Sequence, residues 1–445
     1  MISDLKHTIH NYYRARKAWR RADINDDLYL VALCFFENMS YRLFEDDKND
    51  RLIGLRMAFR LFKRLGKGSD AGVVRKDDSS KSLIVGGNMK PAEEIIRYVA
   101  GNSDDAIHTY LGKDFISVTP SMKWKIMWVM LPFMLRQSIA CLYKPNRINL
   151  ALATHELFEI AYIIWYMKSH GLDTLYDWIP YEKDSNFLSF TAMERGIVVT
   201  KIPSSGPLVT HNRFMLAQRV ALSTPYHLDE VQKFKETIRV QQCLMWPPAS
   251  AMDFVDYYKD KPIQEAKTIG FFSHASWIRK AQGHAEHGRN VAKAEEIILG
   301  YLHRFTKDNP EYKIVIFPHP REKRPDIVER TKAFYRQCLG DATFEMLSNE
   351  EPTIANFHRA SIGIGAFSSI FYDRMYCGFK VLIGNIGFSD FPMRGASLNN
   401  VCFESYEEMV QLIRENELLS ERDFFDKHDM SGYTRWDRPL IINNN

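Results

Sequence analysis

The sequence predicts an α/β protein with two Rossmann-like domains that face a cleft and a helical extension at the N-terminus. Short apolar runs rich in β-branched residues alternate with stretches of helical periodicity, which is typical of parallel sheets covered by helices. The alternation breaks near Trp246-Pro247-Pro248 and then starts again. This break predicts two separate sheets.

Each part of this organisation follows from the order of the apolar runs. Before the break, strands are expected at 83–85, 106–111, 148–153, 174–179, 197–202 and 220–223, and helices at 122–142 and 156–170. After it, strands are expected at 268–272, 314–317, 343–347, 361–364 and 380–383, and helices at 292–305 and 406–415. The resulting segments are a helical extension and linker (1–80), a first Rossmann-like domain (81–246), a linker (247–266), a second Rossmann-like domain (267–425) and a tail (426–445).

The most informative strand is the apolar run Ile314–Phe317, which stops at Pro318-His319-Pro320-Arg321. Its length and its β-branched residues predict a buried parallel strand. The carboxyl end of that strand would deliver His319 and Arg321 to the edge of the sheet where ligands bind in open α/β folds.

A second strand end, at Ser361–Ile364, offers different chemistry. After the turn Gly365-Ala366-Phe367, Ser368 and Ser369 stand where a helix is expected to begin. Small hydroxyl residues can cap a helix, and its first amides can face a phosphate. Taken singly, each motif is equally well explained as structural. Their order on successive sheet units favours a pocket for a phosphate-bearing donor.

These motifs also carry a family resemblance. The segments KIVIFPHPRE and GAFSSIFYD resemble the HP and SS motifs of bacterial sialyltransferases and of Kdo- and capsule-type transferases, which have a GT-B fold. They are also similar to the HP and SS-x-x-x-D elements of polyol-phosphate transferases of teichoic acid synthesis. The resemblance covers roughly residues 265 to 390. It implies an acceptor domain at 81–246 and a nucleotide-donor domain at 267–425.

The donor site implied by the resemblance contains His319, Arg321, Ser368 and Ser369, which would stabilise the leaving phosphate. Ser273, at the end of the strand 268–272, is a further candidate for the donor site. Glu351 stands where the sialyltransferase-like fold places a donor-contacting acid, although a glutamate at a helix start explains it equally well. No D-x-D or metal-ligand cluster stands out, so neither a metal nor another cofactor is expected.

The general base should come from the first domain. The sialyltransferase families carry an acidic pair followed by glycine there, and this sequence lacks it. Glu156, after the strand expected at 148–153, and Glu182, after the strand expected at 174–179, are substitutes at the carboxyl edge of the sheet. Either can instead be an ordinary surface glutamate.

Charge and cysteine content limit the cellular context. The net charge of +4 is too small to indicate nucleic-acid binding. Six cysteines without a C-x-x-C motif indicate reduced thiols, as in a cytoplasmic protein. No apolar segment reaches the roughly 18 residues that a spanning helix needs.

Two predicted helices suggest peripheral contact with the inner face of the cell membrane. Residues 52–63 combine an apolar face with a basic face, and 122–142 carry Trp124 and Trp128 with Lys123, Lys125 and Arg136 nearby. Ordinary packing within the protein explains both helices as well, and Pro132 is expected to interrupt the second.

The sequence therefore favours a metal-independent, inverting glycosyltransferase. Its donor would be a nucleotide-activated sugar, with CMP as the expected nucleotide. The acceptor would be a surface polysaccharide or a glycolipid, that is, a glycan acceptor or a lipid-linked acceptor. Two alternatives remain: a CDP-polyol phosphotransferase of the teichoic-acid type, and a non-catalytic GT-B-like assembly scaffold.

Overall fold

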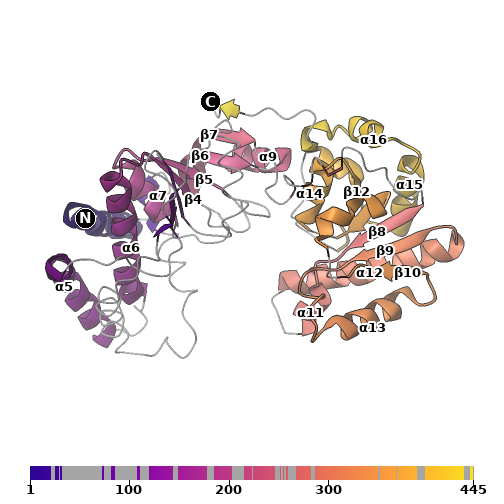
Figure 1. Cartoon of the computed structure of the whole chain (residues 1–445), viewed down its shortest axis with the longest axis horizontal. Helices are drawn as coiled ribbons and strands as arrows, with labels where there is room; N and C mark the ends of the chain where they lie inside the picture. Colours follow the sequence, from indigo (N-terminus) through magenta and orange to yellow (C-terminus); the bar gives the residue numbers. More distant parts are fainter. Residues whose placement is uncertain are drawn as a thin grey trace. The chain divides into compact units, whose positions relative to one another are not determined.

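The computed structural model of the chain describes most of two compact units (Figure 1). The described residues are 1–21, 26–29, 31–32, 73–74, 82–85, 108–110, 120–143, 149–177, 185–202, 215–222, 224–245, 251, 254, 257–258, 267–281, 286–348, 351–366, 368–387, 396–434 and 441–443. The first unit comprises 1–222, 230–244 and 441–445, and the second comprises 223–229 and 245–440. Each unit has its own sheet.

The sheet of the first unit has the strand order β1-β3-β2-β4-β5-β6-β7-β14. Its strands are β1 (Val73–Val74), β2 (Ser82–Val85), β3 (His108–Tyr110), β4 (Thr174–Asp177), β5 (Val198–Lys201), β6 (Met215–Leu222), β7 (Ile238–Met245) and β14 (Ile441–Asn443). The pairs β2–β3, β2–β4, β4–β5 and β5–β6 are parallel. At the two edges, β1 and β14 pair antiparallel with β3 and β7.

Four helices with described bounds lie wholly in the first unit: α1 (Ile2–Arg21), α5 (Pro120–Tyr143), α6 (Asn149–Ser169) and α7 (Ser185–Met193). Helix α9 (Pro225–Lys233) is divided, with residues 225–229 in the second unit and the rest in the first. Helix α1 shares a core with α5 and α6, to which it contributes Leu5, Tyr12 and Ala15. Helix α5 runs through Pro132 without a break, so the expected interruption is wrong.

The strand predicted at 148–153 is also wrong, because α6 begins at Asn149. The segment is rich in leucine and alanine, which favour a helix, and a short apolar run alone cannot distinguish the two structures. The basic helix predicted at 52–63 lies outside the described residues. Within the described part of the chain, no helix is both long and apolar enough to cross a bilayer.

The sheet of the second unit has the order β10-β9-β8-β11-β12-β13, with every neighbouring pair parallel. Its strands are β8 (Thr268–Phe272), β9 (Lys313–Phe317), β10 (Phe344–Met346), β11 (Ile362–Gly365), β12 (Lys380–Gly384) and β13 (Cys402–Phe403). The helices with described bounds are α11 (Ser276–Ala281), α12 (Glu286–Asp308), α13 (Val328–Leu339), η4 (Thr353–Arg359), α14 (Ile370–Tyr376), η5 (Ala396–Val401), α15 (Tyr406–Asn416), α16 (Glu421–Lys427) and η6 (Ser431–Tyr433).

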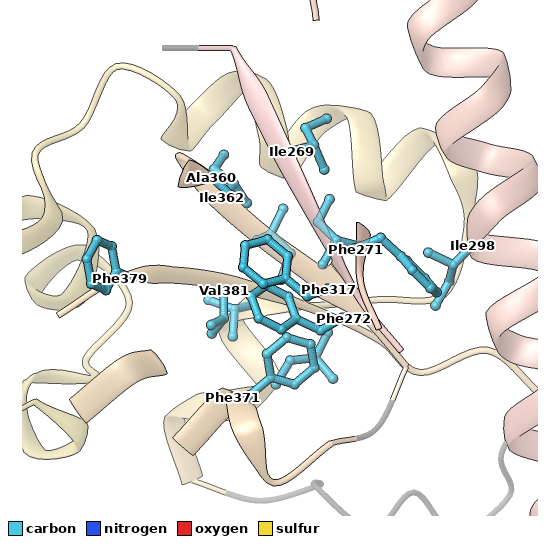
Figure 2. Packing of buried hydrophobic residues seen from close by; sticks show 14 of the residues in the cluster. Ile269, Phe271, Phe272, Ile298, Phe317, Ala360, Ile362, Phe371, Phe379 and Val381 are labelled. Carbon is cyan, nitrogen blue, oxygen red and sulfur yellow. The ribbon is translucent and has the colours of Figure 1, made fainter. Parts of the chain in front are cut away.

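Aromatic side chains pack together in the core of the second unit, where β8 and β9 end (Figure 2). The rings of Phe272 and Phe317, at the ends of neighbouring strands, stack with centroids 4.2 Å apart. Phe371 of α14 meets Phe272 edge-on at 5.7 Å. This packing fixes the ends of β8 and β9 and the start of α14 relative to one another.

A buried arginine ties the same helix to the rest of the unit. Arg374 is fully buried, and its guanidinium donates to the carbonyl oxygens of Phe357, Ala360 and Lys380 at 2.8, 2.6 and 3.0 Å. Burial lowers the pKa of Arg374 to about 9. Helix α14 therefore has a fixed position behind the serine segment.

The predicted fold class is confirmed as two α/β units with mainly parallel sheets and a helix at the N-terminus. Ten of the predicted strands coincide, within a few residues, with β2 to β6 and β8 to β12.

Candidate functional site

The candidate site lies at the carboxyl edge of the second sheet, where β8 and β9 end side by side. Phe272 and Phe317 are register partners in this parallel pair. The residues that follow them, Ser273-His274 and Pro318-His319, therefore reach the same edge. The ring centroids of His274 and His319 lie 6.2 Å apart. The pairing of β8 with β9 thus places His319 at the carboxyl edge of the sheet, as predicted.

A buried carboxylate holds the His319 loop in place. Glu322 is 0% exposed, and one of its oxygens accepts the backbone N–H of His319 at 2.8 Å. The other oxygen accepts the indole N–H of Trp277 at 2.6 Å and the hydroxyl of Tyr335 at 3.1 Å. Burial raises the pKa of Glu322, and these hydrogen bonds oppose the rise. Glu322 is thus a positioning residue for His319.

The hydrogen bond at one ring nitrogen of His319 defines its neutral tautomer. The backbone N–H of Arg321 donates to Nδ1 at 3.1 Å, so Nδ1 is the acceptor. The proton of the neutral ring then resides on Nε2. The side chain is half-buried. His319 can therefore present an N–H donor to an anionic oxygen at this edge.

A second buried carboxylate holds the loop after β8. Glu295 of α12, 4% exposed, accepts the backbone N–H of His274 at 2.6 Å and that of Ser276 at 3.2 Å. Between them, Ala275 has a φ of 55°, a left-handed conformation that costs free energy in a residue with a Cβ. Burial raises the pKa of Glu295 to about 7, and the nearby charge of Glu322 adds to the rise.

The serine segment follows β11, the parallel neighbour of β8 on its other side. A Cβ on Gly365 would lie 2.7 Å from the carbonyl oxygen of Phe272, so only glycine permits this close approach of the two strand ends. Ser368 is nearly buried and Ser369 is exposed. Ser369 has helical backbone angles and makes no side-chain cap, so its hydroxyl is not used in the way the sequence suggested.

The remaining predicted donor residues have different surroundings. Ser273 accepts the backbone N–H of Ala275 at 2.9 Å. Arg321 is exposed, and its guanidinium has no hydrogen-bond or ion-pair partner within the ranges that the structure describes. Glu351 is exposed and accepts the side-chain amide of Asn356 at 3.2 Å.

Of the two candidates for the general base, Glu156 and Glu182, the structure describes only the first. Glu156 is half-buried within α6, because the strand predicted before it is part of that helix, so its predicted position at a strand end is wrong. Glu182 lies outside the described residues.

The structure instead shows a buried ion pair at the carboxyl edge of the first sheet. Asp177 and Lys201 are register partners at the ends of β4 and β5, with the carboxylate and ammonium 3.8 Å apart. The ammonium also donates to the side-chain oxygen of Asn186 at 2.5 Å. The sequence reasoning missed Asp177, although it directly follows the apolar residues of a predicted strand.

Three residues of the second unit were also missed: His274, Glu295 and Glu322. His274 follows Ser273 directly, so the predicted strand end could have indicated it. Glu322 closes the KIVIFPHPRE segment, three residues after His319. Glu295 has no local signal, because it comes from the middle of a helix. In the described part of the chain, no group of His, Cys, Asp and Glu is arranged to hold a metal ion.

Comparison with known proteins gives structural similarity alone. No protein-family model and no curated protein matches the chain. The S. aureus MnaA–UDP co-structure has a TM-score of 0.42 at 12% identity, over 80% of this chain and 91% of that chain. UDP-GlcNAc 2-epimerase from Methanocaldococcus jannaschii has a TM-score of 0.44 at 10% identity, over 76% and 93%. MurG from Acinetobacter baumannii has a TM-score of 0.38 at 13% identity, over 80% and 94%.

Proposed function

We propose that the chain is a glycosyltransferase that binds a nucleotide-activated sugar at the carboxyl edge of the second sheet. The observation that carries the proposal is the fixed position of His319. Its loop is anchored by Glu322 and its tautomer by the amide of Arg321, at a strand end next to that of His274.

Glycosyl transfer breaks the bond between the sugar carbon and the phosphate oxygen, and negative charge accumulates on that oxygen. A hydrogen-bond donor of the protein that is already oriented toward this oxygen stabilises the charge without reorganisation at the moment of reaction. The Nε2–H of His319 can supply such a hydrogen bond. The proposed reaction uses no metal. Its further contacts to the phosphate come from the exposed guanidinium of Arg321 and the hydroxyls of Ser368 and Ser369.

The nucleotide and the acceptor belong to the finer part of the proposal. The HP and SS motifs favour CMP as the nucleotide, and a polysaccharide or glycolipid as the acceptor. UDP, which the S. aureus MnaA structure contains, and CDP, which polyol-phosphate transfer would use, are the alternatives to test. A scaffold without catalysis would need none of them.

The test is a thermal-shift screen of the purified chain against CMP, CDP, UDP, GDP and their sugars without added metal. A ligand at about a hundred times its dissociation constant adds roughly 2.7 kcal/mol to the free energy of unfolding. We expect a clear rise in Tm with one nucleotide class, and we expect His319→Ala to abolish it.

His303→Ala is the matched control, because His303 is half-buried in the same unit but contacts the C-terminal end of α13, before β10 begins. This variant should keep the full shift. A shift with UDP or CDP instead of CMP keeps the site and changes the donor. Absence of any shift, or a shift that survives His319→Ala, would contradict the proposed site and favour the scaffold.

A further inference from the structure

Helix α5 exposes an unusual amount of apolar surface on the first unit. Among the described residues, four of the six exposed large hydrophobic side chains belong to this helix. They are Trp124, Trp128, Leu135 and Ile139, with exposed fractions of 68, 75, 51 and 53%. We call these four residues the apolar stripe. Clustered exposure of this kind marks an interaction surface more often than isolated apolar residues do.

The apolar stripe is a single face of the helix. Successive residues of an α-helix are rotated by about 100°, which places the four side chains within an arc of about 60° and along about 22 Å of the helix. The opposite face holds Ile126, Met130 and Phe133, which are buried in the core of the unit. The ring of Phe133 meets that of Tyr12 in α1 at 5.1 Å. The helix is thus anchored without the apolar stripe.

Positive charge borders the apolar stripe on one side. At the same helical spacing, Lys125 and Arg136 lie within about 60° of one side of the stripe. The sequence of α5 contains no acidic residue. The guanidinium of Arg136 lies 5.4 Å from the ring of Tyr13 in α1. This cationic border is complementary to an anionic surface.

We propose that α5 docks the first unit on an anionic lipid bilayer, with its axis in the plane of the membrane and the apolar stripe inserted at the headgroup level. Tryptophan favours the boundary between headgroups and acyl chains, and lysine and arginine beside it pair with anionic headgroups. A second copy of the chain fits less well, because a symmetric contact would bring the cationic borders together. The proposal is independent of the proposed donor site.

The test is co-sedimentation of the full chain with vesicles of phosphatidylcholine alone and of phosphatidylcholine mixed with phosphatidylglycerol. We expect binding to the anionic vesicles that weakens as salt is added, because salt screens the headgroup charge. The double variant Trp124→Gln/Trp128→Gln should lower the partition coefficient by about tenfold or more. Lys125→Glu should lower it mainly at low salt.

Leu418→Gln is the matched control for the tryptophans, because Leu418 is 90% exposed in the second unit. Lys307→Glu, an exposed cation of α12, is the control for charge. Both should bind like the unaltered chain. Circular dichroism and thermal melting should show that the tryptophan variant is folded.

Three results would overturn the proposal. The first is absence of binding to anionic vesicles, and the second is binding that the tryptophan variant does not reduce. The third is a dimer, measured by light scattering, that the tryptophan variant dissociates, because the occupant of the apolar stripe would then be a second copy.

Discussion

At the scale of single residues, the site is organised by two carboxyl groups that do not themselves reach the solvent. Glu295 accepts the backbone N–H of His274, and Glu322 accepts that of His319. Each carboxyl group therefore fixes the backbone conformation at one of the two histidines. The charge of Glu322 raises the pKa of Glu295 beyond the effect of burial, since two charges this deeply buried repel one another. The pair should therefore make the stability of the second unit depend on pH.

Glu295 gives this dependence a direction. Its pKa rises from 4.5 to about 7 on folding. A raised pKa means that the folded protein binds the proton more tightly, so the stabilisation is complete below about pH 4.5 and is lost as the pH rises through about 7. Between pH 5 and pH 8 the loss amounts to at most about 3 kcal/mol.

The measurement is urea denaturation at pH 5 and at pH 8, for the unaltered chain and for Glu295→Gln. The variant should be less stable at pH 5, because the side-chain NH2 group of glutamine, unlike either carboxyl oxygen, cannot accept a backbone N–H group. Its free energy of unfolding should nevertheless fall less between the two pH values. Equal pH dependence in both proteins would show that Glu295 does not titrate in this range.

How much of the site the sequence could predict depends on how far apart the interacting residues are. His319 and Ser273 follow apolar runs directly, so the position of each at a strand end could be predicted. The role of Glu322 requires Trp277 and Tyr335, which are 45 and 13 residues away. No local sequence pattern predicts contacts between residues so far apart. Until the fold is known, a glutamate beside Arg321 looks like an ordinary surface residue.

At the scale of elements, prediction succeeded where residue composition agreed with position. Strands β8, β9, β11 and β12 are rich in isoleucine, valine and phenylalanine and are bounded by turns. It failed at 148–153, where the apolar residues are leucine and alanine and the pattern continues into α6. Strand β7 was missed because its buried residues do not alternate regularly, and β14 because it has only three residues.

Strand β14 shows that so short an element can still matter. It forms the edge of the first sheet through the register pairs Ile441↔Leu244, Ile442↔Cys243 and Asn443↔Gln242. Its removal would leave the backbone groups of β7 without these partners. At about 1 kcal/mol for each hydrogen bond, truncation after Leu440 should cost roughly 2–3 kcal/mol.

The measurement is urea denaturation together with size-exclusion chromatography and light scattering. Besides the loss of stability, the truncated chain should self-associate, because an open strand edge can pair with another chain. Removal of Asn444 and Asn445 alone is the control and should change neither property. A truncated chain that stays monomeric and equally stable would mean that the pairing of β14 contributes no net stability.

At the scale of the whole molecule, each unit is held by its own core. One core combines α1, α5 and α6 with the first sheet, and the other surrounds the second sheet. The two alternations in the sequence predicted these two sheets, because each needs helices on its faces to bury its strands. The sequence did not allow us to predict that α1 belongs to the first core, because its packing partners in α6 come more than a hundred residues later.

This separation allows the proposed donor site to be assigned to one unit by hydrogen exchange. At about a hundred times its dissociation constant, a nucleotide that binds the edge of the second sheet should slow the exchange of core amides in β8, β9 and β11 by about a hundredfold, wherever exchange requires unfolding of that unit. Amides of β4 and β5 in the first unit should change little. In His319→Ala the slowing should disappear, and in His303→Ala it should persist. Protection centred on β4 and β5 would instead locate nucleotide binding near Asp177 and Lys201, which carry the only buried ion pair at a strand end in the described part of the first unit.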